Sequence, residues 1–140
     1  MKKVITVGVF DLFHFGHLRL FKNIKKQFNE DVFLTVYVQD SDYILKFKPD
    51  SKVMYSTEDR VSMIKELRCV DDVQVYKSIG EDIEHMDFDV WVKGPDQIHE
   101  GFQKAIKYCN EHGKEIITLP RTEFISSTLV KDIISEKLKP

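Results

Sequence analysis

The sequence predicts an α/β fold in which a Rossmann-like, doubly wound sheet of about five parallel strands carries helices on both faces. Short apolar runs rich in β-branched residues alternate with segments whose apolar residues recur at helical spacing. No internal repeat or low-complexity segment interrupts this alternation. Because parallel strands joined by right-handed helical crossovers end at the same edge of a sheet, we expect ligands to bind at that edge.

The first half of the chain is expected to alternate two strands with two helices. Val32 to Val38 is nearly continuous and β-branched, which is typical of a strand covered on both faces. Ser56 can cap the second helix, and Glu58 and Asp59 place acids in its first turn. The expected elements are a strand over Val4 to Val9, a helix carried by Leu18, Phe21, Ile24 and Phe28, the strand over Val32 to Val38, and a helix carried by Val61, Ile64 and Leu67.

A long polar segment, Ser41 to Tyr55, lies between the second strand and the second helix. It contains Lys46, Lys48 and Pro49, and we expect it to form a loop. Connections of this length inside a compact domain are usually functional or mobile.

The second half of the chain continues the alternation. Gly94 and Pro95 end the fourth strand, and Gly113 is expected to stop the following helix in a left-handed conformation. The expected elements are a strand at Val73 and Val75, a short helix with Ile79, Ile83 and Met86, a strand with Phe88, Val90 and Val92, a helix with Ile98, Phe102, Ala105, Ile106 and Cys109, a strand over Ile116 to Leu119, and a last helix with Leu129, Ile133 and Ile134.

The composition predicts a single domain over residues 1–140. The chain is 42% hydrophobic and 31% charged, as in ordinary globular proteins. Its formal net charge of -2 argues against bulk binding to nucleic acid or to an anionic membrane, and no apolar run reaches the length of a membrane span.

Cys69 and Cys109 are isolated, and we interpret them as reduced thiols of a cytoplasmic protein.

The first apolar run stops in glycines, an aspartate and two histidines, in the stretch Gly8-Val9-Phe10-Asp11-Leu12-Phe13-His14-Phe15-Gly16-His17. This turn connects the end of a strand to the start of a helix, where free N–H groups and the helix dipole favour an anion. His14 and His17 are spaced to share one helix face, so they can reach the same anion. The stretch therefore predicts a phosphate site.

The sequence argues against several other kinds of site. There is no G-x-G-x-x-G after a strand and no G-x-x-x-x-G-K-[ST], which disfavours a dehydrogenase or a P-loop enzyme. There is no C-x-x-C, so thiol redox chemistry and a structural zinc site are weak options. The remaining chemistry is phosphate handling by His, Lys, Arg and hydroxyl groups.

Two motifs carry a resemblance to a known family. The stretch from Gly8 to His17 resembles the first motif of the cytidylyltransferases, and Arg121-Thr122-Glu123-Phe124-Ile125-Ser126-Ser127-Thr128 resembles their late R-T-E-G-I-S-T-T motif. With Arg60, the run Leu67 to Asp71 and the run Val92 to Gly94, the similarity spans nearly the whole chain. The chain looks most like the bacterial glycerol-3-phosphate cytidylyltransferases, which make CDP-glycerol for cell-surface polymers and are typically homodimeric.

This resemblance implies attack of a phosphate monoester on the α-phosphorus of CTP, with pyrophosphate leaving. By resemblance, the catalytic residues are His14, His17, Lys46 and Arg121. The implied nucleotide-binding residues are Gly8, Val9, Phe10, Asp11, Gly16, Gly94, Asp96, Thr122, Ile125, Ser126, Ser127 and Thr128, and the implied acceptor-binding residues are Asp40, Lys48, Arg60, Arg68 and Gln97. Mg²⁺ is expected to bind mainly through the nucleotide phosphates, with few ligands from the protein.

Several alternatives remain open. Lys46 and Lys48 can also belong to a solvated loop, Arg60 and Arg68 can be helix-surface charges, and Asp96 can simply form a turn. Gly94-Pro95-Asp96-Gln97 differs from the G-D-D-W typical of the glycerol enzymes and resembles the corresponding turn of archaeal FAD synthetases. The alternative functions are therefore cytidylyl or adenylyl transfer to another phosphate acceptor, such as ethanolamine phosphate or FMN, or nucleotide binding without catalysis.

Overall fold

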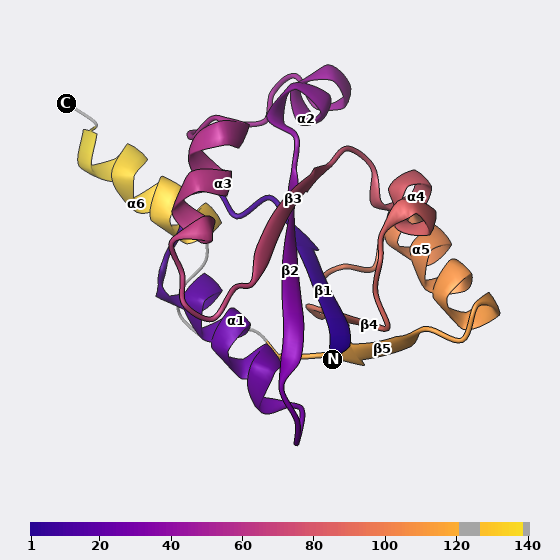
Figure 1. Ribbon diagram of the computed structural model, residues 1–140. Helices are drawn as coiled ribbons and strands as arrows, with labels where there is room; N and C mark the ends of the chain where they lie inside the picture. The colour runs from indigo at the N-terminus through magenta and orange to yellow at the C-terminus, as the bar shows by residue number, and fades with distance from the viewer. Residues whose placement is uncertain (121–126, 139–140) are drawn as a thin grey trace.

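The computed structural model describes residues 1–120 and 127–138 of the chain (Figure 1). The predicted site residues Arg121, Thr122, Ile125 and Ser126 lie outside the described residues. The described elements are β1 (Lys2–Gly8), α1 (Phe15–Lys26), β2 (Val32–Gln39), α2 (Ser41–Phe47), α3 (Thr57–Lys65), β3 (Asp72–Tyr76), α4 (Ile79–Asp82), the 3₁₀ turn η1 (Ile83–His85), β4 (Val90–Lys93), α5 (Glu100–Glu111), β5 (Glu115–Thr118) and α6 (Ser127–Leu138).

The strands described form one five-stranded sheet in the order β3-β2-β1-β4-β5, and every neighbouring pair is parallel. The predicted doubly wound parallel sheet is thus confirmed. The strand order reverses beside β1, because β1 pairs with β2 on one side and with β4 on the other. In open sheets of this kind the crevice for ligands lies at the carboxyl ends of the strands next to that reversal.

Helices cover both faces of the sheet, with α1 and α3 on one side and α4 and α5 on the other (Figure 1). Each face has its own apolar core. Phe21 and Ile24 of α1 and Ile64 of α3 are buried in one core, and Phe102 and Ala105 of α5 are buried in the other. Because central strands contribute side chains to both cores, they appear in the sequence as continuous apolar runs.

The segment after β2 differs from the prediction. Ser41–Phe47 forms the helix α2, so the expectation of a loop over the whole of Ser41 to Tyr55 is wrong for its first half. The Ile44 N–H bonds the Asp40 carbonyl and the Ile44 side chain is buried, which anchors this short helix. Ile44 is the only buried residue of this seven-residue helix, and two turns are too short to repeat an inward position and give a periodic signal.

The predicted stop at Gly113 is confirmed, since this glycine has a φ of 66° just after α5. Its left-handed backbone lets the Lys114 N–H reach the Cys109 carbonyl at 2.9 Å. Cys69 and Cys109 are both free thiols. Among residues 1–120 and 127–138, no helix has the length and apolar character needed to cross a bilayer.

Candidate functional site

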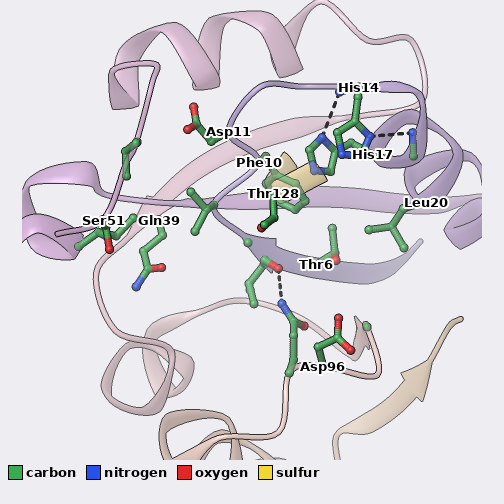
Figure 2. Close-up of a pocket in the computed structure, with 18 of the residues that line it drawn as sticks. Thr6, Phe10, Asp11, His14, His17, Leu20, Gln39, Ser51, Asp96 and Thr128 are labelled. Atoms are coloured by element: carbon green, nitrogen blue, oxygen red, sulfur yellow. Dashed lines mark hydrogen bonds between the residues drawn. The ribbon is translucent and has the colours of Figure 1, made fainter. Parts of the chain in front are cut away.

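A cavity of about 1030 Å³ opens at the carboxyl edge of the sheet (Figure 2). Among the described residues, its lining comes mainly from the end of β1 and the turn after it, from α1, from α2 with the segment that follows it, from the turn after β4, and from α6, with Gln39, Leu119 and Pro120 in addition. The lining residues include Gly8, Val9, Phe10, Asp11, His14, Gly16, His17, Tyr43, Phe47, Lys48, Gly94, Asp96, Gln97, Thr128 and Lys131. The volume is ample for a nucleotide together with a small second substrate.

The turn after β1 has a strained backbone. Phe10 and Leu12 have φ angles of 53° and 47°, in the left-handed region that costs a non-glycine residue roughly 1–2 kcal/mol. Gly8 makes the turn possible, because a Cβ at this position would lie 2.8 Å from Cζ of the Phe10 ring. That ring is 7% exposed and packs edge-on against Phe21, so burial holds the turn in its strained shape.

Two hydrogen bonds fix the imidazoles of His14 and His17. The Gly16 N–H donates to Nδ1 of His14 at 3.0 Å, and the His14 N–H donates to Nδ1 of His17 at 3.2 Å. The two rings stack with their centroids 3.9 Å apart (Figure 2). Because each Nδ1 is an acceptor, each neutral ring carries its proton on Nε2. Nε2 of His14 is buried and has no hydrogen-bond partner among the described residues.

Both histidines are neutral at physiological pH. Burial lowers the pKa of His17 to about 3, assisted by the adjacent His14 and opposed by Asp11. Burial also lowers the pKa of His14. The pair therefore presents two N–H donors rather than two cations.

Asp11 connects the turn after β1 to two other segments. Its carboxylate is 3% exposed, and it accepts hydrogen bonds from the Met54 N–H at 2.7 Å and the Tyr55 N–H at 3.0 Å. Lys131 of α6 pairs with the same carboxylate at 2.7 Å. Burial alone would raise the pKa of Asp11, but the hydrogen bonds from Lys131, Met54 and Tyr55 outweigh it and leave the pKa below its usual value. An ionised Asp11 thus organises the rim of the cavity.

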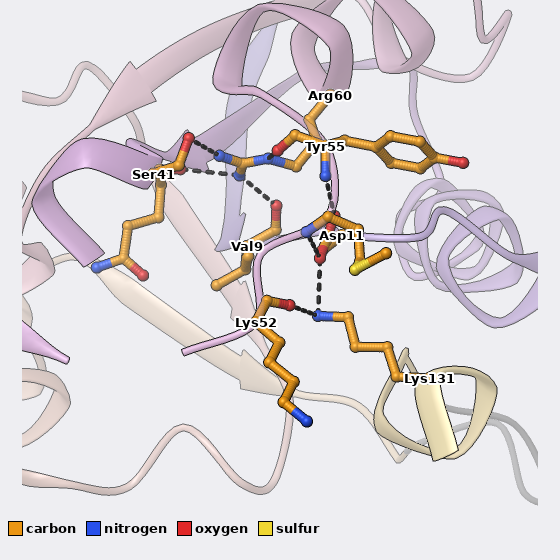
Figure 3. Close-up of polar contacts among 9 residues, drawn as sticks. Val9, Asp11, Ser41, Lys52, Tyr55, Arg60 and Lys131 are labelled. Atoms are coloured by element: carbon orange, nitrogen blue, oxygen red, sulfur yellow. Dashed lines mark hydrogen bonds and ion pairs between the residues drawn. The ribbon is translucent and has the colours of Figure 1, made fainter. Parts of the chain in front are cut away.

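Arg60 does not face the cavity, contrary to the prediction that it binds the acceptor. Its side chain is fully buried, and all five of its N–H groups donate within the protein. Figure 3 shows Arg60 beside Val9, Ser41 and Tyr55. The acceptors are the carbonyls of Val9, Gln39 and Tyr55 and the hydroxyls of Ser41 and Thr57. No donor remains for a ligand, so Arg60 instead ties the ends of β1 and β2 to α2 and α3.

Three other predicted residues are also absent from the cavity wall. Lys46 is exposed, with Nζ 5.6 Å from the Phe47 ring centroid. Asp40 accepts a hydrogen bond from the Thr57 hydroxyl at 3.2 Å. Arg68 is exposed in the turn that precedes β3, at the amino edge of the sheet and opposite the cavity. The acceptor role predicted for Arg68 is therefore not supported within one chain.

The turn after β4 does reach the cavity, as predicted. Gly94, Asp96 and Gln97 line it, and Nε2 of Gln97 donates to the Val7 carbonyl at 2.8 Å. Because a carbonyl accepts this bond, the Gln97 amide must present Oε1 on its other side. That oxygen is buried and has no partner among the described residues. Gln97 therefore ties this turn to β1 and presents an acceptor to the cavity.

Sequence reasoning missed Lys131, although a signal for it was present. Lys131 lies one helical turn after Thr128, so both residues share the face of α6 that lines the cavity. Lys52 and Tyr43 were also missed, because nothing in their local pattern distinguishes them from surface residues.

Comparisons with known proteins agree with the geometry of the site. Residues 5–133 match the family model described as cytidylyltransferase-like. The chain is 34% identical over 139 residues to glycerol-3-phosphate cytidylyltransferase of Bacillus subtilis, covering 96% of this chain and 98% of that one. It is 36% identical to the Staphylococcus aureus enzyme of the same name, covering 94% and 93%. It is also 28% identical to an FAD synthase of Thermococcus kodakarensis, covering 84% and 79%.

A solved structure confirms the fold. The lipopolysaccharide core biosynthesis protein of Thermoplasma volcanium superposes with a TM-score of 0.67 at 21% identity, covering 89% of this chain and 99% of that one.

Proposed function

Because the chain belongs to the cytidylyltransferase-like family, we propose that it transfers CMP from CTP to glycerol 3-phosphate, giving CDP-glycerol and pyrophosphate. The observation that carries this proposal is the stacked pair His14 and His17, whose Nδ1 atoms are both hydrogen-bonded so that both Nε2–H groups remain for a ligand. The pair lies in the wall of a nucleotide-sized cavity, beside a helix amino end that favours anions.

The reaction is an in-line displacement at phosphorus. An oxygen of the acceptor's phosphate bonds to the α-phosphorus of CTP, while the bond from that phosphorus to the bridging oxygen of the β-phosphate breaks and pyrophosphate takes the electron pair. The second pKa of a phosphate monoester is about 6, so the nucleophile is already largely ionised at pH 7 and needs no strong base. The enzyme mainly orients the two substrates and offsets developing charge.

His14 and His17 suit the second task. As neutral donors they lose little to desolvation in the free enzyme, and they can hydrogen-bond the α-phosphate oxygens as these gain charge. We assign the triphosphate to the glycine turn at Gly8, to Thr128 and to the amino end of α6, with Arg121 and Ser127 as further ligands by family resemblance.

Lysines following β2 would add positive charge. Lys48 already lines the cavity, and Lys46 would have to swing inward from its exposed position. Gln97 is the most suitable ligand for the acceptor's hydroxyl groups, because its Oε1 is a buried acceptor without a partner among the described residues.

The residues of the cavity fit a Mg²⁺ ion that enters with the nucleotide. Within residues 1–120 and 127–138, no three His, Cys, Asp or Glu side chains are grouped as metal ligands. Asp11 is bonded to Lys131 and two backbone amides, and Asp96 is a second carboxylate in the cavity wall. Such a site suits an ion held mainly by phosphate oxygens and water, where it would neutralise charge on the leaving group. A cytoplasmic homodimer is our expectation from the family resemblance.

The test is to mix the purified protein with CTP, Mg²⁺ and glycerol 3-phosphate and to measure pyrophosphate, with CDP-glycerol identified by mass spectrometry. Product that depends on all three reagents supports the proposal. CTP binding by calorimetry, without turnover on any of a broad panel of phosphorylated alcohols, would instead identify a nucleotide-binding protein that lacks catalysis.

A further inference from the structure

We propose that Lys131 is a positioning residue that fixes the amino end of α6, and with it Thr128, against the turn after β1. This inference rests on the proposed function, because it concerns how the same cavity is assembled around a triphosphate. Lys131 acts through Asp11 and the Lys52 carbonyl rather than on the reacting atoms.

The contacts of Lys131 join three segments of the chain at one point. Its Nζ lies 2.7 Å from Oδ2 of Asp11 and donates to the Lys52 carbonyl at 2.6 Å (Figure 3). The same carboxylate accepts the Met54 and Tyr55 amides. The turn after β1, residues 52–55 and α6 therefore share one network.

This network is well shielded from solvent. The Lys131 side chain is 25% exposed and the Asp11 side chain 3%. A charge pair with so little water around it is screened less than a surface pair, and removal of one partner leaves the other charge buried. Lysine suits this point because a single ammonium can donate to two acceptors in different directions.

Apolar packing holds α6 only in part. No described residue of α6 belongs to either apolar core, and its exposed apolar side chains are Leu129 at 42%, Ile133 at 51%, Ile134 at 41% and Leu138 at 78%. Polar contacts therefore contribute to fixing the position of the helix. Lys131 is one turn from Thr128 and both line the cavity, so the Lys131 contacts set where the first turn of α6 meets a ligand.

The test compares Lys131→Met with Lys137→Met. Methionine keeps the length and helix propensity of lysine but removes its charge and donors. Lys137 is an exposed lysine of the same helix, so its variant controls for a lost charge on α6. A third variant, Lys131→Arg, keeps a cation that can still reach Asp11.

The first readout is hydrogen exchange without substrate, which does not depend on the reaction. We expect Lys131→Met to speed exchange about tenfold in the first turns of α6 and at the Met54 and Tyr55 amides, because the network that closes them is broken. Lys137→Met should leave these rates unchanged, and Lys131→Arg should restore most of the protection. Unchanged exchange in Lys131→Met would overturn the proposal.

The second readout separates positioning from general stability. We expect Lys131→Met to raise KM for CTP about tenfold while KM for the acceptor changes less than about threefold, because α6 contacts only the triphosphate in this assignment. Equal losses for both substrates, or no change in KM for CTP, would overturn the positioning role.

The test still gives a result if the wild-type protein is inactive or if the Lys131→Met variant does not fold. If the wild-type protein does not turn over CTP with any acceptor, the proposed function fails, and the exchange rates and the calorimetric Kd for CTP still test Lys131. If circular dichroism shows that Lys131→Met is unfolded, Lys131→Gln is measured against the same criteria.

Discussion

The backbone amide of His14 donates to Nδ1 of His17, so the residue that caps α1 also sets the tautomer of the histidine three positions later. His17 thereby keeps its proton on Nε2, and the low pKa of about 3 keeps the ring neutral. A neutral donor of this kind contributes most where charge develops during the reaction.

We expect His17→Ala to lower kcat by about two orders of magnitude or more, with a smaller change in KM for CTP. Steady-state kinetics with CTP varied at saturating acceptor measures both parameters. His112→Ala is the matched control, because His112 is exposed beyond the end of α5 and away from the cavity. A His17→Ala enzyme with a near-normal kcat would remove His17 from the mechanism.

The same histidine predicts how stability depends on pH. In the unfolded chain His17 gains a proton near pH 6.5, whereas in the folded protein burial keeps it neutral down to about pH 3. Between these values the unfolded state binds more protons, so the free energy of unfolding falls as the pH falls, by up to about 1.4 kcal/mol per pH unit. The lowered pKa of His14 acts in the same direction.

Urea unfolding at pH 7, 6 and 5 measures this slope. His17→Asn removes the titrating group, and its stability should decline less steeply over that range than the wild-type stability. Parallel declines for the two proteins would show that His17 does not have the buried, neutral state described here.

The order of elements and the parallel sheet could be predicted because strands buried on both faces, such as Val32–Gln39, leave a continuous apolar run in the sequence. The grouping of Gly8, His14 and His17 at the cavity could be predicted because these residues are close in sequence. The role of Arg60 could not be predicted, because its five acceptors come from the turn after β1, from β2 and α2, from Tyr55 and from the first residue of α3, and they meet only in the folded chain. The role of Lys131 could not be predicted either, because its partner Asp11 lies near the other end of the sequence.

The buried hydrogen bonds of Arg60 predict a large loss of stability when this side chain is replaced. Replacing the fully buried Arg60 with Met leaves the carbonyls of Val9, Gln39 and Tyr55 without this donor, whereas the hydroxyls of Ser41 and Thr57 keep their hydrogen bond to each other. Buried polar groups without partners cost about 1–3 kcal/mol each, so we expect the free energy of unfolding to fall by at least about 3 kcal/mol. Urea unfolding followed by circular dichroism measures the loss.

Arg68→Met is the control for this substitution. Arg68 is exposed in the turn before β3, so its loss should change stability by no more than about 0.5 kcal/mol and leave KM for the acceptor unaltered. A large rise in KM for the acceptor in Arg68→Met would restore the acceptor role predicted from the sequence. A stable Arg60→Met protein would contradict the structural role of Arg60.

The expected preference for glycerol 3-phosphate rests on a buried hydrogen-bond acceptor in the cavity wall. Oε1 of Gln97 is buried without a partner among the described residues, and a hydroxyl of glycerol 3-phosphate can donate to it. We therefore expect Gln97→Leu to lower kcat/KM for glycerol 3-phosphate by about tenfold to a hundredfold, the range set by one unpaired polar group. Gln103→Leu is the control, because Gln103 is exposed on α5 and its side-chain amide donates to the nearby Ile98 carbonyl, away from the cavity.

FMN is the most informative competitor for glycerol 3-phosphate. Tyr43 and Phe47 of α2 give the cavity an aromatic wall that a ring system can pack against, and an FAD synthase is among the relatives. Ethanolamine and choline phosphates carry a cation, which Lys48 and Lys52 in the same wall disfavour. We expect glycerol 3-phosphate to have the highest kcat/KM when it is compared with these acceptors and with serine phosphate, using CTP and ATP in parallel. If another acceptor exceeds it tenfold, the acceptor assignment is wrong, whereas nucleotidyl transfer at His14 and His17 stands because those residues address the nucleotide and not the acceptor.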